Sequence, residues 1–402
     1  MTRTLAWMTA LLCAAGGPET SAAARESEPC ESTRAEDDGA DEDQNLDDLD
    51  PFSVRLQQDP VFRSQLKAGV MVERGLMHLS ERLRQGRDGG LPSVSGKDPI
   101  VAKMALTALA FMANGNTTEH SPFSIELRQC LRWLVSRVKE VPSRSSISPP
   151  PTVLYFFDAR DNLSRMHGHG YATWALALSF GMAMGGDSNS RDRFEIKRVL
   201  AGAVRCIEQS QTESGGWGYE YERGTFHEGS MTVTQLQALR SARDAGIHVD
   251  EEVIDSAVRY LRDSKIREGP RQGAYRYKLG DLNTSFALTA AAVSSLNQTG
   301  VYDDSDIDDG MEYMRQSDPL MNAKNEKFPW YSRLYATQAY WQYRELEPFR
   351  RFYPILVERI SNAADPRDGA FNDGSEYGSD YSTALGVIAL SVPFGYLPSF
   401  QR

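Results

Sequence analysis

Two kinds of apolar segment alternate along the chain from about residue 52. In the first kind, apolar residues recur at steps of three and four with charges between them, as in 203–210 and 257–264. This pattern indicates helices with one buried face. The second kind, as in 171–178, carries few charges on any face, and a helix that is apolar all round belongs in a buried layer.

The two kinds pair up six times. The segments 203–210, 257–264 and 310–317 align at offsets of 54 and 53 residues, which indicates a structural repeat. Helical hairpins that stack on their neighbours form a solenoid or close into a ring, and the apolarity of the second kind favours a double ring. We expect outer helices near 60–85, 123–140, 193–209, 250–263, 305–316 and 349–362, and inner helices near 98–113, 170–184, 230–243, 283–297, 331–345 and 379–392. No β-hairpin pattern of comparable length competes with these helical patterns.

A loop rich in glycine and aromatic residues joins each outer helix to its inner partner. One of these loops holds Gln211, Gly215 and Trp217 in the spacing Q-x-x-x-G-x-W, and 365–371 is a degraded copy. The chain therefore resembles the terpenoid cyclase and protein prenyltransferase (squalene cyclase-type) repeat superfamily. The resemblance implies an all-α fold, an (α/α)₆ toroid spanning 52–402, in which Gln211, Gly215 and Trp217 fasten adjacent repeats.

The catalytic motifs of that superfamily are not recognisable here. Asp306-Ile307-Asp308-Asp309 has the letters of the cyclase D-x-D-D motif, but it falls at the start of an outer helix, where acids favour the helix N-terminus. Cys206 lies on an outer helix and no D-x-C sequence accompanies it, so no zinc prenyltransferase site is expected. We assign no catalytic residue, no metal and no cofactor, and leave open whether the protein is an enzyme.

The N-termini of the inner helices should meet at one mouth of the ring. Loops that precede them carry the acids Glu220, Glu222, Glu228 and Glu376, and His167 lies in the loop before another inner helix. Tyrosines recur at one repeat position, which packing alone would also explain. The candidate mouth or cavity residues are His169, Tyr171, Tyr219, His227, Tyr335, Asp380 and Tyr381.

The N-terminal region predicts export. Residues 1–24 combine Arg3, a short apolar run and Ala22-Ala23-Ala24, which is the pattern of a cleavable signal peptide. Residues 25–50 hold twelve acids against two arginines, so we expect a disordered acidic leader over 25–51. This region carries nearly all of the net charge of −11, and a near-neutral body argues against nucleic acid as a partner. We expect a secreted or periplasmic cell-envelope protein with no stable membrane span after cleavage.

These observations predict an exported toroid that acts as a binding scaffold. The sequence does not decide whether its ligand is a glycan, an isoprenoid lipid or a protein segment. One alternative is a carbohydrate-active lyase or hydrolase at the mouth. A second alternative is a cyclase-like enzyme that processes an isoprenoid in the cavity, which would need a closed apolar interior.

Overall fold

The computed structural model describes residues 51–86, 88–92, 98–161, 165–182, 190–298, 304–322, 326–372, 375 and 377–401. The expected signal peptide over 1–24 and the expected leader as far as residue 50 lie outside the described residues. The chain divides into two compact units, residues 1–62 and 63–402. In the first unit, α2 (Pro51–Gln58) precedes Asp59, whose carboxylate accepts the backbone N–H groups of Val61 and Phe62.

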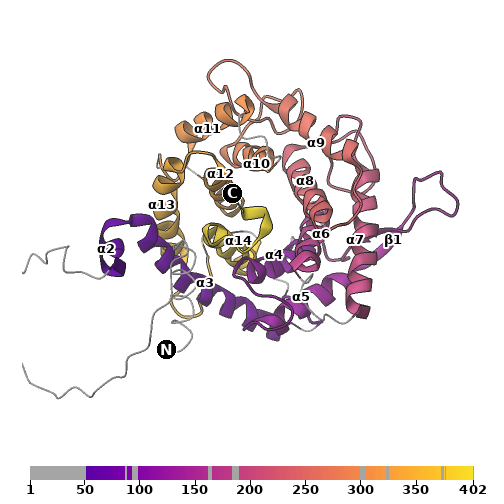
Figure 1. The fold of residues 1–402 in the computed structure, drawn as a ribbon. Helices are drawn as coiled ribbons and strands as arrows, with labels where there is room; N and C mark the ends of the chain where they lie inside the picture. Colours follow the sequence, from indigo (N-terminus) through magenta and orange to yellow (C-terminus); the bar gives the residue numbers. More distant parts are fainter. Residues whose placement is uncertain are drawn as a thin grey trace, which may run out of the picture. The chain divides into compact units, whose positions relative to one another are not determined.

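The second unit is a double ring of helices, with inner and outer helices alternating along the chain (Figure 1). The outer helices are α3 (Pro60–Gln85, in this unit from Arg63), α5 (Ser124–Ser136), α7 (Ser190–Ser210), α9 (Glu251–Ser264), α11 (Ser305–Ser317) and α13 (Glu347–Ala363). The inner helices are α4 (Ile100–Ala113), α6 (Arg165–Met182), α8 (Gly229–Asp244), α10 (Phe286–Asn297), α12 (Pro329–Gln342) and α14 (Gly378–Ser391). Each inner helix packs on the next, and α14 packs on α4, so the ring closes. The all-α toroid with six hairpins is confirmed.

Burial follows the two sequence patterns. Every residue of α4 is buried, whereas α9 buries one stripe formed by Ile254, Ala257, Tyr260, Leu261 and Ser264. Small residues allow the inner helices to approach closely. A Cβ added at Gly170 of α6 would lie 2.7 Å from the Thr234 methyl group of α8. The inner layer therefore depends on residue size as well as on apolarity.

A short β-hairpin corrects one expectation. The helix expected over 123–140 ends at Ser136, and the next residues form β1 (Val138–Val141), which pairs antiparallel with β2 (Val153–Phe156). All four residues of β2 are buried, and Leu154 packs where Gly202 of α7 leaves room. Strands of four residues are too short for a period of two to stand out from a helical pattern. The segment between the strands projects from the outer ring (Figure 1).

The loops that join outer to inner helices dock on the next outer helix in a repeated way. Gly215, Gly273 and Gly369 all have positive φ, and a Cβ on them would overlap the backbone carbonyls of Ser256, Asp309 and Arg74, respectively. The aromatic residue two positions later donates its backbone N–H to a threonine hydroxyl of the inner helix: Trp217 to Thr232 at 3.4 Å, Tyr275 to Thr289 at 3.1 Å and Phe371 to Thr383 at 2.8 Å. The contact between Gly369 and α3 joins the last repeat to the first.

Gln211 and Trp217 strengthen one of these junctions. The Gln211 side-chain amide donates to the carbonyls of Gly215 and of Val253 in α9, both at 2.9 Å. The Trp217 ring is fully buried, and its Nε1 donates to the Ile207 carbonyl of α7 at 2.8 Å. These contacts join one repeat to the next.

The C-terminal segment lies beside the last residues of α8, α10 and α12, with which it lines a pocket, and the chain ends inside the ring in the view of Figure 1. After η3 (Val392–Phe394), the turn η4 (Pro398–Phe400) places the Phe400 ring, fully buried, 6.4 Å from the Trp174 ring of α6. Trp341 Nε1 and Gln342 Nε2 of α12 donate to the carbonyls of Phe400 and Ser399 at 2.9 and 2.8 Å. The chain therefore occupies this end of the ring itself.

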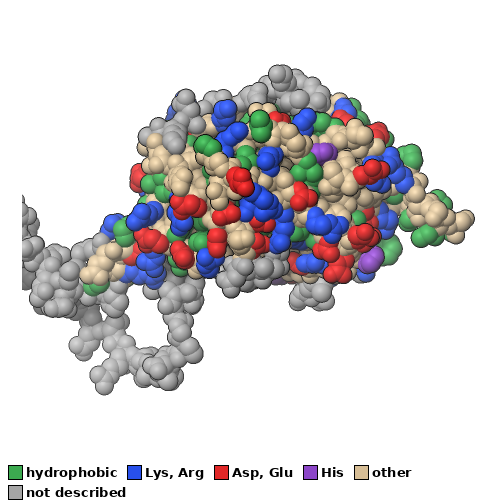
Figure 2. Space-filling model, turned by 90° about the horizontal axis from the view of Figure 1, so that it is seen from above, with side chains coloured by type: hydrophobic (Ala, Val, Ile, Leu, Met, Phe, Trp, Pro, Cys, Tyr) green, Lys and Arg blue, Asp and Glu red, His purple; other side chains and the backbone are tan. Residues whose placement is uncertain are grey.

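The remaining surface is mixed in charge. Figure 2 shows Lys and Arg side chains interspersed with Asp and Glu side chains over the visible side of the second unit. Cys130 and Cys206 are both buried free thiols. Across the described ranges, the helices are too short or too polar to cross a bilayer.

We expect Gly215→Ala to destabilise the protein strongly. The new Cβ costs about 1–2 kcal/mol for the left-handed backbone and more for the overlap with the Ser256 carbonyl. Gly246→Ala is the matched control, because Gly246 has a similar φ of +80° with nothing within 4 Å of its added Cβ. Chemical denaturation should give a larger loss for Gly215→Ala, and equal losses would contradict the docking account.

Trp217→Ala should lower the free energy of unfolding by roughly 3–5 kcal/mol, because it leaves a cavity and an unpaired Ile207 carbonyl. Phe194→Ala is the control, since the Phe194 side chain is exposed and its loss should stay within about 0.5 kcal/mol. Calorimetry would measure both. A melting temperature that falls by a degree or less in Trp217→Ala would show that Trp217 has no structural role.

Candidate functional site at the N-terminal mouth

The N-termini of all six inner helices lie at one mouth of the ring, because each inner helix follows an outer helix through a single connection. We call this end the N-terminal mouth. The C-terminal segment occupies the opposite end. A candidate site therefore has to be sought among the side chains at the starts of the inner helices.

Four tyrosines gather at the N-terminal mouth. The hydroxyl groups of Tyr171 of α6 and Tyr335 of α12 lie close enough to affect each other's pKa, although these helices lie on opposite sides of the inner ring (Figure 1). The ring of Tyr331 lies 4.6 Å from that of Tyr335, and the hydroxyl of Tyr381 of α14 is close enough to affect Tyr171, Tyr331 and Tyr335 electrostatically. We call these four side chains the tyrosine floor.

The tyrosine floor consists of neutral hydroxyl groups. Burial raises the pKa of Tyr171, Tyr331 and Tyr335 well above the ordinary value, and neighbouring tyrosines raise it further. The Tyr335 hydroxyl donates to Gln237 Oε1 of α8 at 3.3 Å. The Tyr331 hydroxyl has no hydrogen-bond partner within the described residues, although its ring is half-buried. The floor thus offers hydrogen bonds and aromatic surface, but no ready base.

A carboxyl group, a hydroxyl group and an imidazole form a chain beside the floor. Glu228 precedes α8, and its Oε1 accepts the Met231 backbone N–H at 2.9 Å and the Ser230 hydroxyl at 2.5 Å. Ser230 Oγ lies 3.2 Å from His167 Nε2 of α6, and the His167 ring stacks on Tyr171 with centroids 6.2 Å apart.

The charge states along this chain are set by burial. Burial raises the pKa of Glu228 above its ordinary value, against the hydrogen bonds from Ser230 and Met231. Burial lowers the pKa of His167 to about 3, so its imidazole is neutral at physiological pH. A carboxyl group of raised pKa beside a neutral imidazole is suited to acid–base work.

A second perturbed carboxyl group lies between the starts of α4 and α6. Asp161 Oδ2 accepts the Val101 backbone N–H at 3.3 Å, while Oδ1 is buried with no hydrogen-bond partner within the described residues. Burial raises the pKa of Asp161 to about 7. This aspartic acid therefore titrates near neutral pH.

The rim of the mouth comes from the loops that follow α7 and α9. The hydroxyl groups of Tyr219 and Tyr277 hydrogen-bond to each other, and the Tyr219 carbonyl accepts the Met166 backbone N–H at the start of α6 at 3.0 Å. Glu220 pairs with Arg165 at 3.4 Å and stays half-exposed. The Glu228 backbone N–H donates to the Trp217 carbonyl at 3.0 Å, which places the loop that carries Tyr219 next to the Glu228 chain.

Three of the expected mouth residues point elsewhere. His169 is fully buried, where Nδ1 accepts the Phe156 backbone N–H of β2 at 3.2 Å and Nε2 lies 3.2 Å from the Ala203 carbonyl. His227 Nδ1 lies 2.9 Å from the Tyr260 hydroxyl of the outer helix α9. Asp380 is fully buried and accepts from Arg82 of α3 at 2.8 Å. The polar groups of these three side chains are held by neighbouring backbone or side-chain groups, so we do not include them with the tyrosines. Tyr171, Tyr335 and Tyr381 do come together, and Tyr219 lies at the rim.

The D-x-D-D sequence lies on the outer ring. Asp308 is partly exposed on α11 and pairs with Arg344 at 2.6 Å, far from a cavity of the kind that alkene protonation needs. Within the described ranges, no group of three or more His, Cys, Asp or Glu side chains is placed to hold a metal ion.

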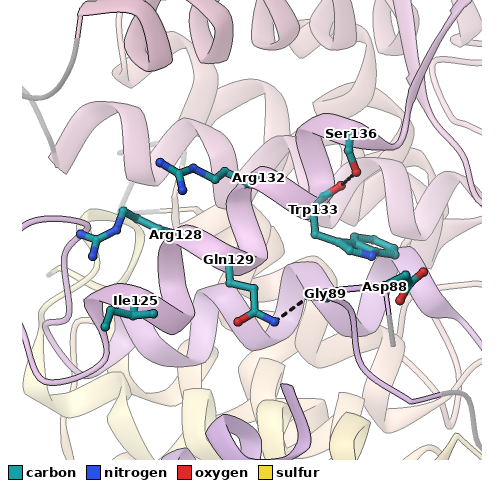
Figure 3. A pocket seen from close by; sticks show the side chains of 8 residues that line it. All are labelled: Asp88, Gly89, Ile125, Arg128, Gln129, Arg132, Trp133 and Ser136. Atoms are coloured by element: carbon teal, nitrogen blue, oxygen red, sulfur yellow. Dashed lines mark hydrogen bonds between the residues drawn. The ribbon is translucent and has the colours of Figure 1, made fainter. Parts of the chain in front are cut away.

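The outer ring also carries an open pocket of about 490 Å³ beside α5, shown in Figure 3. Its lining includes Asp88, Gln129, Arg132 and Trp133. The Gln129 amide donates to the Gly89 carbonyl at 2.9 Å. The pocket lies on the outer helices and includes no residue of the tyrosine floor.

Asp161 and Tyr331 were missed as candidates from the sequence. Tyr331 could have been found, because it precedes Tyr335 by four residues and shares its helix face. Asp161 lies in a loop with no periodicity, and only the folded chain brings it to the start of α4.

Comparison with known proteins gives a structural match. Neither a protein-family model nor a curated protein sequence matches the chain. A solved structure that matches is that of a GH76 α-mannanase from Bacteroides thetaiotaomicron, with a TM-score of 0.54 and 11% sequence identity. The match covers 80% of this chain and 94% of the mannanase chain. At this identity, the likeness shows the toroid fold.

This finding corrects the expected family and function. The assignment to the terpenoid cyclase and prenyltransferase superfamily is wrong, because no family model supports it and the matching toroid is a glycoside hydrolase. The expectation that the protein is a binding scaffold of that superfamily is therefore wrong as well. The Q-x-x-x-G-x-W spacing reports how repeats pack, as the contacts of Gln211 and Trp217 show.

Asp161→Asn should change how stability depends on pH. The raised pKa means that the folded protein keeps the proton between pH 3.8 and about 7, where the unfolded chain has released it. Wild-type stability should therefore fall as the pH rises through that window. The variant cannot ionise, so it should match wild type near about pH 4 and exceed it by on the order of 2 kcal/mol near about pH 8.

Asp308→Asn is the control for this pH series. Although partial burial opposes the shift, hydrogen bonds from Arg344 and Tyr343 lower the pKa of Asp308, so its ionised form stabilises the fold. This variant should lose stability relative to wild type as the pH rises. Urea denaturation across the pH range measures both, and parallel curves for Asp161→Asn and wild type would contradict the burial account.

Proposed function

We propose that the protein is an exported carbohydrate-active enzyme that hydrolyses glycosidic bonds at the N-terminal mouth. The observation that carries this proposal is the Glu228–Ser230–His167 chain beside the tyrosine floor. It combines a carboxyl group of raised pKa with aromatic rings and neutral hydroxyl groups.

These groups match the needs of a glycan. Sugars present hydroxyl groups and apolar C–H faces, and neutral tyrosines offer hydrogen bonds and ring surface to both. The Tyr331 hydroxyl is buried without a hydrogen-bond partner within the described residues, and a sugar hydroxyl that reached it would satisfy it. A bare hydrocarbon would leave such hydroxyl groups without partners, which disfavours an isoprenoid substrate.

Hydrolysis of a glycosidic bond needs a protonated carboxyl group to donate to the leaving oxygen. Burial raises the pKa of Glu228 and so favours its protonated form, and the Ser230 hydroxyl connects it to the neutral imidazole of His167. Asp161 is the second carboxyl group of raised pKa near the mouth. We assign Glu228 as the acid, with His167 and Ser230 as positioning residues.

The charge state of the tyrosines favours a hydrolase over a lyase. A lyase that abstracts a sugar proton with tyrosine needs a phenol that ionises readily. Burial raises the pKa of Tyr171 and Tyr335 instead. The fold also hosts a GH76 α-mannanase, and this likeness supports the proposal by analogy.

Export is part of the proposal, because polysaccharides lie outside the cytoplasm. It rests on the signal-peptide pattern of residues 1–24. N-terminal sequencing of the protein recovered from the cell envelope or medium should find Arg25 as the first residue. Recovery of intact chains from the cytosol alone would contradict export.

Glu228→Gln should abolish hydrolysis while keeping the fold. Loss of the acid should lower kcat by about 100-fold or more with KM nearly unchanged. A panel of polysaccharides assayed by release of reducing ends should first identify a substrate of the wild-type protein. Glu220→Gln is the matched control, because Glu220 is half-exposed at the rim and pairs only with Arg165.

Tyr331→Phe separates binding from stability. It removes a hydroxyl group that has no partner in the described structure, so the melting temperature should not fall. KM should rise severalfold if that hydroxyl group binds sugar. A wild-type protein that cleaves no polysaccharide, or a fully active Glu228→Gln variant, would contradict the proposed function.

A further inference from the structure

A small polar pocket lies at the other end of the ring, where the inner helices finish. It has a volume of about 170 Å³ and is formed by α8, α10, α12 and the C-terminal segment. The side chains that matter are Arg240, Arg243, Asn297, Gln342 and Ser399. None of them belongs to the tyrosine floor or the Glu228 chain.

Arg240 is a buried cation that makes no direct ion pair within the described residues, although the Asp244 carboxylate, which also lines the pocket, attracts it. Its side chain is 5% exposed, and its one hydrogen bond within the described residues goes from Nη1 to the Ser295 carbonyl of α10. Burial, followed by repulsion from Arg243, lowers the pKa of Arg240 to about 10, so the guanidinium remains charged at neutral pH. A charge held out of water in this way destabilises the fold unless something compensates it.

The other buried cations of the described chain are all compensated. Lys103 pairs with Asp98 at 2.8 Å, Lys265 with Asp306 and Asp309 at 2.5 and 2.6 Å, and Arg333 with Glu326 at 2.7 Å. The fold therefore pairs its buried cations as a rule. Arg240 departs from this rule at the wall of a pocket.

Further polar atoms of the same pocket lack partners. Gln342 Oε1 and Ser399 Oγ are both buried with no hydrogen bond within the described residues. Gln342 Nε2 is held by the Ser399 carbonyl at 2.8 Å, which fixes its amide toward the C-terminal segment. The carbonyls at the ends of α8 and α10 offset part of the Arg240 charge. They leave the Ser399 hydroxyl unsatisfied.

We propose that this pocket binds a small oxyanion, either a carboxylate or a phosphate, through the Arg240 guanidinium and the Ser399 hydroxyl. A guanidinium presents paired N–H groups that match two oxygens of such an ion. The volume equals that of about six water molecules, which suits a group of a few heavy atoms. The bound ion links α8 to the C-terminal segment and so fastens that segment to the inner ring.

Thermal melting in matched salts tests the proposal. The probes are sodium phosphate, sodium acetate and sodium glucuronate, each against sodium chloride at equal ionic strength. At least one probe should raise the wild-type melting temperature in a saturable way, because a ligand bound only by the folded state stabilises it. The three arms distinguish inorganic phosphate from a simple carboxylate and from a sugar acid.

Variants assign the effect to the pocket. Arg240→Gln should weaken the binding of the active probe at least about tenfold. Arg259→Gln is the control, because Arg259 is exposed on the outer helix α9 and does not line the pocket, so its loss should alter binding by less than about threefold. Ser399→Ala is the second variant, available if Arg240→Gln does not fold, and should weaken binding severalfold.

Two results would overturn the proposal. One is a wild-type protein that responds to none of the three probes beyond chloride. The other is an equal response in wild type and in Arg240→Gln or Ser399→Ala. Neither result bears on hydrolysis at the N-terminal mouth, since no residue is shared between the two sites.

Discussion

The structure depends on a glycine loop that docks against the next outer helix. Gly215, Gly273 and Gly369 press their backbones on Ser256, Asp309 and Arg74, at a distance that no side chain would permit. Because Gly369 reaches the first outer helix, the last contact closes the ring. Closure then brings α6 and α12 across from each other, so that Tyr171 and Tyr335 form a single floor.

Closure also makes the two ends of the ring different. The parallel inner helices place their N-termini with Glu228, His167 and the tyrosine floor at one mouth, while Phe400 and the rest of the C-terminal segment occupy the other end. At the first end, burial raises the pKa of Glu228 and of the tyrosine phenols and so favours their protonated, neutral forms. The second end instead retains a buried charge on Arg240. The N-terminal mouth is therefore suited to a neutral polysaccharide, and the opposite end is suited to binding an anion.

The sequence predicted the architecture well because the two helix types differ in local composition. All six pairs, and the docking role of the loop around Gly215, follow from that difference. The hairpin of β1 and β2 was not predicted, because its strands have only four residues each. On an inner helix every face is buried, so periodicity does not reveal which face meets the axis. This is why the sequence could not separate Tyr171, which lies near Tyr335, from His169, two residues away, which contacts β2. The Q-x-x-x-G-x-W spacing suggested the wrong family because it encodes packing, which chemically unrelated toroids share.

The central claim is that the tyrosine floor and Glu228 form a glycan site at the N-terminal mouth. A crystal structure of the Glu228→Gln variant with an oligosaccharide of the identified substrate tests it most directly. The account expects the sugar to contact Tyr331 and Tyr381, with a glycosidic oxygen within hydrogen-bond reach of residue 228. Sugar bound in the open pocket beside α5, or no sugar at the mouth under saturating conditions, would contradict it.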